Sequence, residues 1–167
     1  MNAGHPRNQA AETVFALLVT SDTRTKEQDE TGKLAVQLIE AAGHRVQFYD
    51  VAPNDLEEIE EWLRRALKEP QVRVILTSGG TGIGVKDKTM DVAQSLFEKP
   101  LPGFGEYFRR ISFDDVGLPG IWSRAAAGVA AGKLVFCLPG SKGAVWSALK
   151  EIILPGLGHM LWELDRR

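Results

Sequence analysis

The chain has 167 residues, a length that suits one domain with a sizeable core and is short for two. Hydrophobic residues make up 44% of it and charged residues 25%, which is ordinary for a globular protein and argues against disorder. A formal net charge of −2 argues against a nucleic-acid partner, because a broad binding face for nucleic acid needs clustered Lys and Arg.

The sequence carries no pattern typical of export or of membrane insertion. Residues 1–12 lack an apolar core of signal-peptide length, and no later segment approaches the ~20 unbroken apolar residues of a membrane span. The single cysteine, Cys137, excludes an internal disulfide, and its apolar setting predicts a buried side chain. We therefore expect a cytoplasmic protein with a polar tail over residues 1–12 and one domain over residues 13–167.

The first half of the chain alternates between strand and helix patterns. Short apolar runs rich in β-branched residues predict strands, and apolar residues at helical spacing predict the helices between them. For the second of these helices we expect Asn54 to be the N-cap, with Glu57 completing a capping box. The predicted elements are a strand over 13–20, a helix over 31–43, a strand over 44–51, a helix over 54–69 and a strand over 72–78.

The second half is less regular until its last strand. The segment WSRAAAGVAAG, residues 122–132, is rich in alanine and predicts the start of a helix. Pro155 is expected to separate two C-terminal helices. The predicted elements are a helix over 90–98, a short helix within 100–112, the helix start at 122, a strand over 133–140, and helices over 143–153 and 156–165.

Strands that alternate with helices imply right-handed crossovers, so the predicted fold class is α/β: a mostly parallel open sheet in a single domain, with helices on both faces. In such a sheet, ligands bind outside the carboxyl ends of the strands. The loops that follow the predicted strands carry small polar residues and carboxylates, which favours a site for a polyanion. These loops cover residues 21–25, 50–55, 78–87 and 139–143.

The loop after the third strand, in LTSGGTGIGVKD, contains four glycines. It does not fit the dinucleotide fingerprint GxGxxG, because Val85 stands where the last glycine is needed. It does not fit the Walker loop either, because Val85 and Lys86 replace the required Lys and Ser or Thr. What remains is the mechanism that both share, in which glycines let backbone amides approach phosphate oxygens.

The order of several motifs resembles a known family. The glycine loop is followed by Asp87, then by PLPGFGEYFR, SRAAAGV and LPGS. This set, from about Thr13 onward, resembles the molybdopterin-binding family of the molybdenum-cofactor pathway, of the MogA/MoaB molybdopterin adenylyltransferase type. The segments VTSDTRTKEQDETG and IILPGLGHMLWEL are more similar to the MoaB branch.

The resemblance implies an enzyme that binds molybdopterin, ATP and Mg²⁺ and transfers AMP to the terminal phosphate of molybdopterin, releasing pyrophosphate. It also implies a homotrimer or homohexamer, with a molybdenum insertase as a partner. A non-catalytic molybdopterin-binding or assembly protein is the alternative, and a nucleotide hydrolase on the same fold is a more distant one. The loop departs from the family pattern of Arg-Asp with a later proline, since Lys86 and Met90 occupy those places.

Specific residues match the family's functional positions. Asp50 and Asp87 match its two important aspartates, with roles in catalysis and in binding Mg²⁺. The alternatives are a turn-forming residue for Asp50 and a helix cap for Asp87. The further candidates are Ser21 and Asp22 beside the cleft, Gly79, Gly80, Thr81 and Gly82 around the nucleotide phosphates, Glu106 at a family-typical position, Ser123 and Arg124 holding the pterin or its phosphate, and Pro139, Gly140, Ser141 and Lys142 closing the site.

Overall fold

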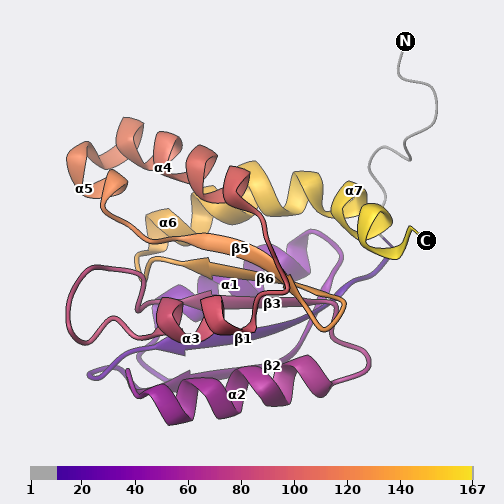
Figure 1. The fold of residues 1–167 in the computed structure, drawn as a ribbon, viewed down its shortest axis with the longest axis horizontal. Helices are drawn as coiled ribbons and strands as arrows, with labels where there is room; N and C mark the ends of the chain where they lie inside the picture. The colour runs from indigo at the N-terminus through magenta and orange to yellow at the C-terminus, as the bar shows by residue number, and fades with distance from the viewer. Residues whose placement is uncertain (1–10, 167) are drawn as a thin grey trace.

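A six-stranded sheet forms the middle layer of the molecule (Figure 1), with the strand order β2-β1-β3-β6-β5-β4. The computed structural model describes residues 11–166, so most of the predicted tail over residues 1–12 lies outside the described residues. The first four strands in this order run parallel, and β5 and β4 are antiparallel to their neighbours. The strands are β1 Val14–Thr20, β2 Arg45–Ala52, β3 Val74–Ser78, β4 Lys99–Pro100, β5 Ala126–Ala130 and β6 Lys133–Leu138.

Helices cover both faces of the sheet and bury one apolar cluster on each side (Figure 1). One cluster packs the sheet against α1, α4 and the C-terminal helices, and the other packs it against α2 and α3. The predicted α/β fold is therefore confirmed. The helices are α1 Glu30–Ala41, α2 Leu56–Lys68, α3 Thr89–Leu96, α4 Pro102–Val116, α5 Leu118–Ile121, α6 Lys142–Ser147, the π-helical turn η1 Ala148–Ile153 and α7 Leu154–Asp165.

The expected alanine-rich helix over 122–132 is wrong, because residues Ala126–Ala130 form strand β5. This strand pairs with β6 through a tight turn in which Ala131 and Gly132 both have positive φ. A Cβ at Gly128 would lie 2.5 Å from the ring of Phe97, so the small residues allow close packing. Tertiary packing therefore overrides the helix propensity of the alanines.

The expected break at Pro155 is also wrong, because the chain remains helical from Lys142 to Asp165. Pro155 lies in the first turn of α7, directly after η1. In this wider turn the amide of Leu154 donates to the carbonyl of Leu149, five residues back. The π-helical turn shifts the hydrogen-bond ladder just before Pro155, a residue that has no amide hydrogen to donate.

The N-terminus of α2 differs from the prediction by one residue. Asp55, not Asn54, caps the helix, and its carboxylate accepts from the amides of Glu57 and Glu58, each at 3.0 Å. Asn54 is held instead by Asp22, whose Oδ1 accepts from the Asn54 amide at 2.8 Å. A contact between two loops thus takes Asn54 away from the capping position.

Within residues 11–166, no helix has both the length and the apolar character needed to cross a membrane. The predicted burial of Cys137 is confirmed, since its side chain in β6 is fully buried.

Candidate functional site

The glycine loop after β3 folds back tightly against its neighbours. Gly79 and Gly80 have φ values of 105° and 66°, a region that L-residues with side chains seldom adopt. A Cβ at Gly79 would lie 2.5 Å from the Thr20 carbonyl oxygen, and one at Gly80 would lie 2.2 Å from Thr89 Oγ1. Both glycines are therefore required by conformation and by space.

The backbone carbonyls of this loop accept hydrogen bonds from protein groups, whereas three of its backbone amides point to no protein acceptor among the described residues. The Gly80 carbonyl accepts from the Met90 amide at 3.4 Å, and the Thr81 carbonyl accepts from the Arg124 amide at 2.7 Å. The Gly82 carbonyl accepts from Arg124 Nε at 2.8 Å. In the described part of the chain, the amides of Gly80, Thr81 and Gly82 donate to no protein acceptor. The loop thus leaves a row of donors for a ligand.

The loop also encloses the carboxylate of Asp87. Asp87 Oδ2 accepts from the Gly84 amide at 2.8 Å, and a Cβ at Gly82 would lie 2.6 Å from the same oxygen. The N-cap position of α3 belongs to Lys88 and has no side-chain cap, so Asp87 is not a helix cap. The carboxylate is therefore positioned by the glycine loop itself.

Arg124, in the segment before β5, stabilises the glycine loop and Asp87 through hydrogen bonds. Its Nη2 donates to the Asp87 carbonyl at 2.8 Å and its Nη1 pairs with Asp91 at 2.7 Å, in addition to the Nε contact with Gly82. All three guanidinium nitrogens of Arg124 thus contact protein groups, so Arg124 positions the loop. That Arg124 also holds the pterin or its phosphate stays a prediction.

A pocket of about 380 Å³ opens between the glycine loop and the loop after β6. It brings together seven of the predicted site residues. Trp122 and Ile83 add exposed apolar surface, which sequence reasoning did not assign to the site. The lining residues are Gly80, Thr81, Gly82, Ile83, Asp87, Pro119, Trp122, Ser123, Pro139 and Gly140.

The loop after β1 approaches the glycine loop through Asp22. The Asn54 amide donates to Asp22, and Lys86 Nζ lies 3.9 Å from Asp22 Oδ2. The hydrogen bond from Asn54, aided by the charge of Lys86, lowers the pKa of the Asp22 carboxyl. Asn54 Oδ1 is buried and has no hydrogen-bond partner in the described structure. This place of Asn54 was not predicted, because the pattern over residues 54–57 indicated a helix cap.

Ser21 and the residues around it shape the same loop. Ser21 Oγ accepts from the amides of Thr23 and Arg24, so the hydroxyl forms a local turn. Arg24 Nη1 donates to Thr31 Oγ1 at 3.3 Å and lies 3.5 Å from the fully buried carboxylate of Asp29. The Thr31 hydroxyl in turn donates to the Gly140 carbonyl at 3.4 Å, which connects this loop to the one after β6.

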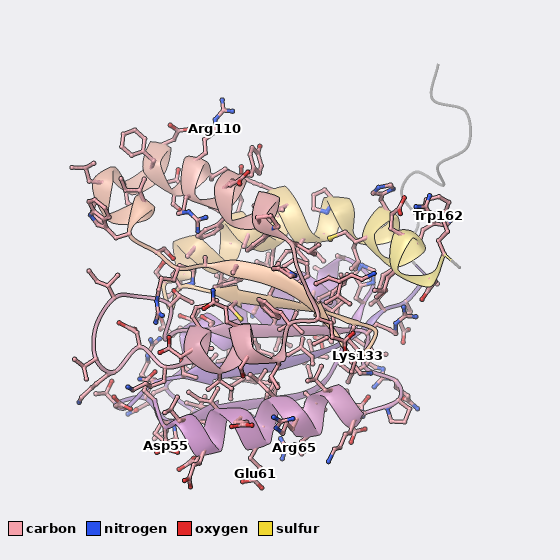
Figure 2. All side chains as sticks on the ribbon, viewed as in Figure 1. Asp55, Glu61, Arg65, Arg110, Lys133 and Trp162 are labelled. Carbon is pink, nitrogen blue, oxygen red and sulfur yellow. The ribbon has the colours of Figure 1, made fainter. Side chains whose placement is uncertain are left out.

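Asp50 was predicted, like Asp87, to serve in catalysis and in binding Mg²⁺, but the structure does not bring its side chain to the pocket of the glycine loop. Its Oδ2 accepts from Trp62 Nε1 and from Arg65 Nη2, each at 2.7 Å. The side chain lies on the face of β2 that α2 covers, in a separate open hollow lined by acidic and basic residues of α2. In Figure 2, Glu61 extends from α2 away from the sheet, and Arg65 lies on the same helix. The side-chain alternation of β2 therefore directs Asp50 toward α2.

Three further predicted residues have other surroundings. Glu106 is exposed on α4 and lines a hollow beside β4 and β5, so the structure does not bring it to the glycine loop. Lys142 forms an ion pair with Glu30 of α1. Ser141 caps α6, where its Oγ accepts from the Ala144 amide at 3.1 Å, although it also lines the neighbouring pocket.

Residues 11–166 contain no group of three or more His, Cys, Asp and Glu side chains that could hold a metal ion. Mg²⁺ that is bound together with a nucleotide needs fewer protein ligands. The protein often supplies only one or two carboxylates, and the phosphates supply further ligands. Asp87 fits this requirement, since Gly84 occupies one carboxylate oxygen and leaves Oδ1 for a cation.

Comparison with known proteins gives a consistent result. Residues 16–159 match the family model described as a probable molybdopterin binding domain. The chain is 42% identical to molybdenum cofactor biosynthesis protein B of Halalkalibacterium halodurans over 166 residues, which cover 98% of each chain.

Solved structures agree. A crystal structure of a molybdenum cofactor biosynthesis protein B superposes with a TM-score of 0.90 at 42% identity and covers 95% of this chain and 100% of the other. The tungsten cofactor synthesizing protein MoaB from Pyrococcus furiosus superposes with a TM-score of 0.85 at 32% identity and covers the same shares.

Proposed function

The chain belongs to the molybdopterin-binding domain family of molybdenum cofactor biosynthesis proteins, and from this premise we propose that it is a Mg²⁺- and ATP-dependent molybdopterin adenylyltransferase. In this reaction an oxygen of the terminal phosphate of molybdopterin attacks the α-phosphorus of ATP. A new phosphorus–oxygen bond forms, the bond to the α,β-bridging oxygen breaks, and pyrophosphate leaves with the electron pair.

One observation carries the proposal: the glycine loop directs its carbonyls into the protein and leaves the amides of Gly80, Thr81 and Gly82 for a ligand. Backbone amides without protein partners that line a pocket are typical of phosphate sites. Asp87 lies in the same pocket, as a transfer between two phosphorylated substrates requires.

The residues of the chain supply position and charge. The three amides would bind phosphate oxygens of ATP, and the Thr81 hydroxyl would add a donor. Arg124 would hold the loop in the binding conformation through its contacts with Gly82 and Asp87. Pro139 and Gly140 would form the opposite wall against which the second phosphate lies. Fixed donors of this kind stabilise charge that develops in the transition state without reorganising.

Asp87 would hold Mg²⁺ together with phosphate oxygens of the nucleotide. When bound, the cation would neutralise phosphate charge and so lessen the repulsion between the two anionic substrates.

The test is a reaction of purified protein with molybdopterin, ATP and Mg²⁺, in which adenylylated pterin and pyrophosphate are both measured. We expect the Asp87→Asn variant to lose at least ~100-fold in rate, because the amide cannot supply an anionic ligand to the cation. The matched control is Asp50→Asn, which removes a carboxylate outside the pocket and should retain activity. Equal rates for wild type and Asp87→Asn would contradict the assigned role.

A second candidate function is a non-catalytic molybdopterin-binding or assembly protein. It is favoured by the separation of Asp50 from the pocket, which leaves Asp87 as the only carboxylate among the described residues that line the pocket. Tight molybdopterin binding with no pyrophosphate in the same assay would establish this candidate. ATP turnover in the absence of molybdopterin would indicate a nucleotide hydrolase instead.

A further inference from the structure

A second pocket, of about 240 Å³, adjoins the pocket of the glycine loop. The two share Pro119, Ser123 and Pro139, so they lie side by side, and we refer to the two pockets together as the cleft. The walls of the second pocket come from the last turn of α4, from α5 and from α6. Its lining residues are Ser112, Asp115, Val116, Pro119, Gly120, Ser123, Pro139, Ser141, Gly143, Ala144 and Ser147.

The wall formed by α4 and α5 is fixed by close packing. A Cβ at Gly120 would lie 2.6 to 2.8 Å from atoms of Ser112, so α5 lies directly on α4 at this point. The Gly117 amide donates to the Phe113 carbonyl at 2.9 Å and joins the two helices. The pocket is therefore a preformed part of the fold.

The polar groups of this pocket are few, and most serve the protein. The hydroxyls of Ser141 and Ser123 accept from the amides of Ala144 and Ala125. Asp115 differs, because its carboxylate contacts only a hydroxyl: Ser147 Oγ, from a buried residue of α6, lies 3.4 Å from Asp115 Oδ2. Among residues 11–166 no Lys or Arg forms an ion pair with Asp115, so its acceptor capacity is open to a ligand.

A pterin ring offers the complementary chemistry. The pyrimidine edge of a pterin carries the N3 hydrogen and the 2-amino group side by side, and a carboxylate accepts from two such donors at once. The flat faces of the ring suit an apolar slot, which Val116, Pro119 and Pro139 provide here. The terminal phosphate of molybdopterin lies at the end of the molecule opposite to this edge.

We propose that Asp115, oriented by Ser147, recognises the pyrimidine edge of the pterin, and that the substrate extends along the cleft past Ser123 to place its phosphate beside Asp87. This inference rests on the proposed function and assigns the orientation of the substrate within it. Only one orientation satisfies both pockets, since the transfer of AMP requires the phosphate end of molybdopterin, and not the ring, to lie beside Asp87 and the ATP that the glycine loop binds.

The test measures equilibrium binding of molybdopterin and, separately, of ATP to wild type, Asp115→Asn and Asp114→Asn. The Asn variant keeps the shape of residue 115 but replaces one acceptor oxygen with a donor, so we expect molybdopterin to bind about 10- to 100-fold more weakly. ATP affinity should not change. Asp114→Asn makes the same charge change in the same turn of α4, and because Asp114 does not line this pocket, neither affinity should change.

A second readout isolates the recognised edge. Wild type should prefer 6-hydroxymethylpterin over 6-hydroxymethyllumazine, in which an oxygen replaces the 2-amino group, and Asp115→Asn should lose this preference. Equal molybdopterin binding by wild type and Asp115→Asn, or equal binding of the two ring systems by wild type, would overturn the inference and leave the proposed function standing. If wild type binds ATP but not molybdopterin, both are overturned.

Discussion

At the scale of single residues, the site depends on glycines that no side chain can replace. Gly80 has a φ of 66°, and a Cβ added to it would lie 2.2 Å from Thr89 Oγ1. Gly103 in α4 is a matched control, because nothing lies within 4 Å of an added Cβ there. The same chemical change, glycine to alanine, thus meets two opposite environments.

Gly80→Ala should lower the free energy of unfolding by ~1–3 kcal/mol and weaken ATP binding, because a strained backbone and a displaced Thr89 distort the loop. Gly103→Ala should leave ATP binding unchanged and should not destabilise the protein, since helices favour alanine over glycine. Denaturant unfolding and calorimetric titration with ATP measure both effects. Unchanged ATP affinity in Gly80→Ala would show that the loop conformation is not needed for binding.

Arg124 acts on the site through backbone carbonyls of the glycine loop. Arg124→Ala should lower the adenylylation rate by at least ~10-fold, because the loop and Asp87 lose a guanidinium that contacts both. Arg124→Lys should restore little of this rate, because an ammonium lacks the planar fork that reaches three acceptors. Arg110→Ala is the control, since Arg110 extends from α4 into solvent in Figure 2.

Hydrogen exchange of residues 79–88 separates positioning from direct phosphate binding by Arg124. Faster exchange in Arg124→Ala without any ligand is expected for a positioning residue. Unchanged exchange together with a lower rate would instead assign Arg124 to the substrate.

At the scale of elements, β2 and α2 are joined by the contacts of Asp50 with Trp62 and Arg65. Asp50→Asn should therefore lower the free energy of unfolding by about 1 kcal/mol, the usual range for one hydrogen bond and a half-exposed ion pair. The adenylylation rate should stay within about twofold of wild type. A large loss of adenylylation rate in Asp50→Asn, with an unchanged free energy of unfolding, would show that Asp50 takes part in catalysis.

Cys137 in strand β6 makes the free energy of unfolding depend on pH. Burial raises the pKa of its thiol to about 11, from an ordinary value of 9.0. Between these values the unfolded chain holds fewer protons than the folded one, so the free energy of unfolding falls as pH rises from about 9 to 11. Below pH 9.0 this contribution to stability is fully present.

Cys137→Ala should remove this part of the pH dependence, measured by denaturant unfolding between pH 8 and pH 11. In wild type, iodoacetamide at pH 8 should label Cys137 only after unfolding, because the buried thiol is protonated and inaccessible. Rapid labelling of the folded protein would contradict the burial.

At the scale of the whole molecule, apolar side chains gather where α4 meets α5. Leu118 is 60% exposed and Phe113 is 47% exposed. Contiguous exposed apolar residues often mark protein interfaces. If the protein forms the trimer or hexamer that the family resemblance implies, this surface is where we expect a second copy of the chain to bind.

Leu118→Asp should lower the molar mass in solution toward that of one chain, because a carboxylate would be buried without a partner in the interface. Leu56→Asp is the control, since Leu56 is 46% exposed but lies at the start of α2, on the opposite face of the sheet. Light scattering measures both. A Leu118→Asp variant that keeps the mass of wild type would place the interface elsewhere.

Local patterns were enough to predict the four parallel strands of the sheet, most helices and the glycine loop, because periodicity and glycine content act over a few residues. Local patterns failed where distant residues compete. The alanine segment became β5 because β6 offered a partner, and Asn54 left its capping position because Asp22 bound its amide.

The sequence by itself determined the fold class, the family and the place of Asp87 after a phosphate-type loop, since these depend on the order of residues along the chain. Only the tertiary structure decided that Arg124 holds the loop, that Asp50 faces α2, and that Asp115 and Asp87 lie along one cleft. Such relations join residues far apart in the chain, and the side-chain directions that create them are set by packing.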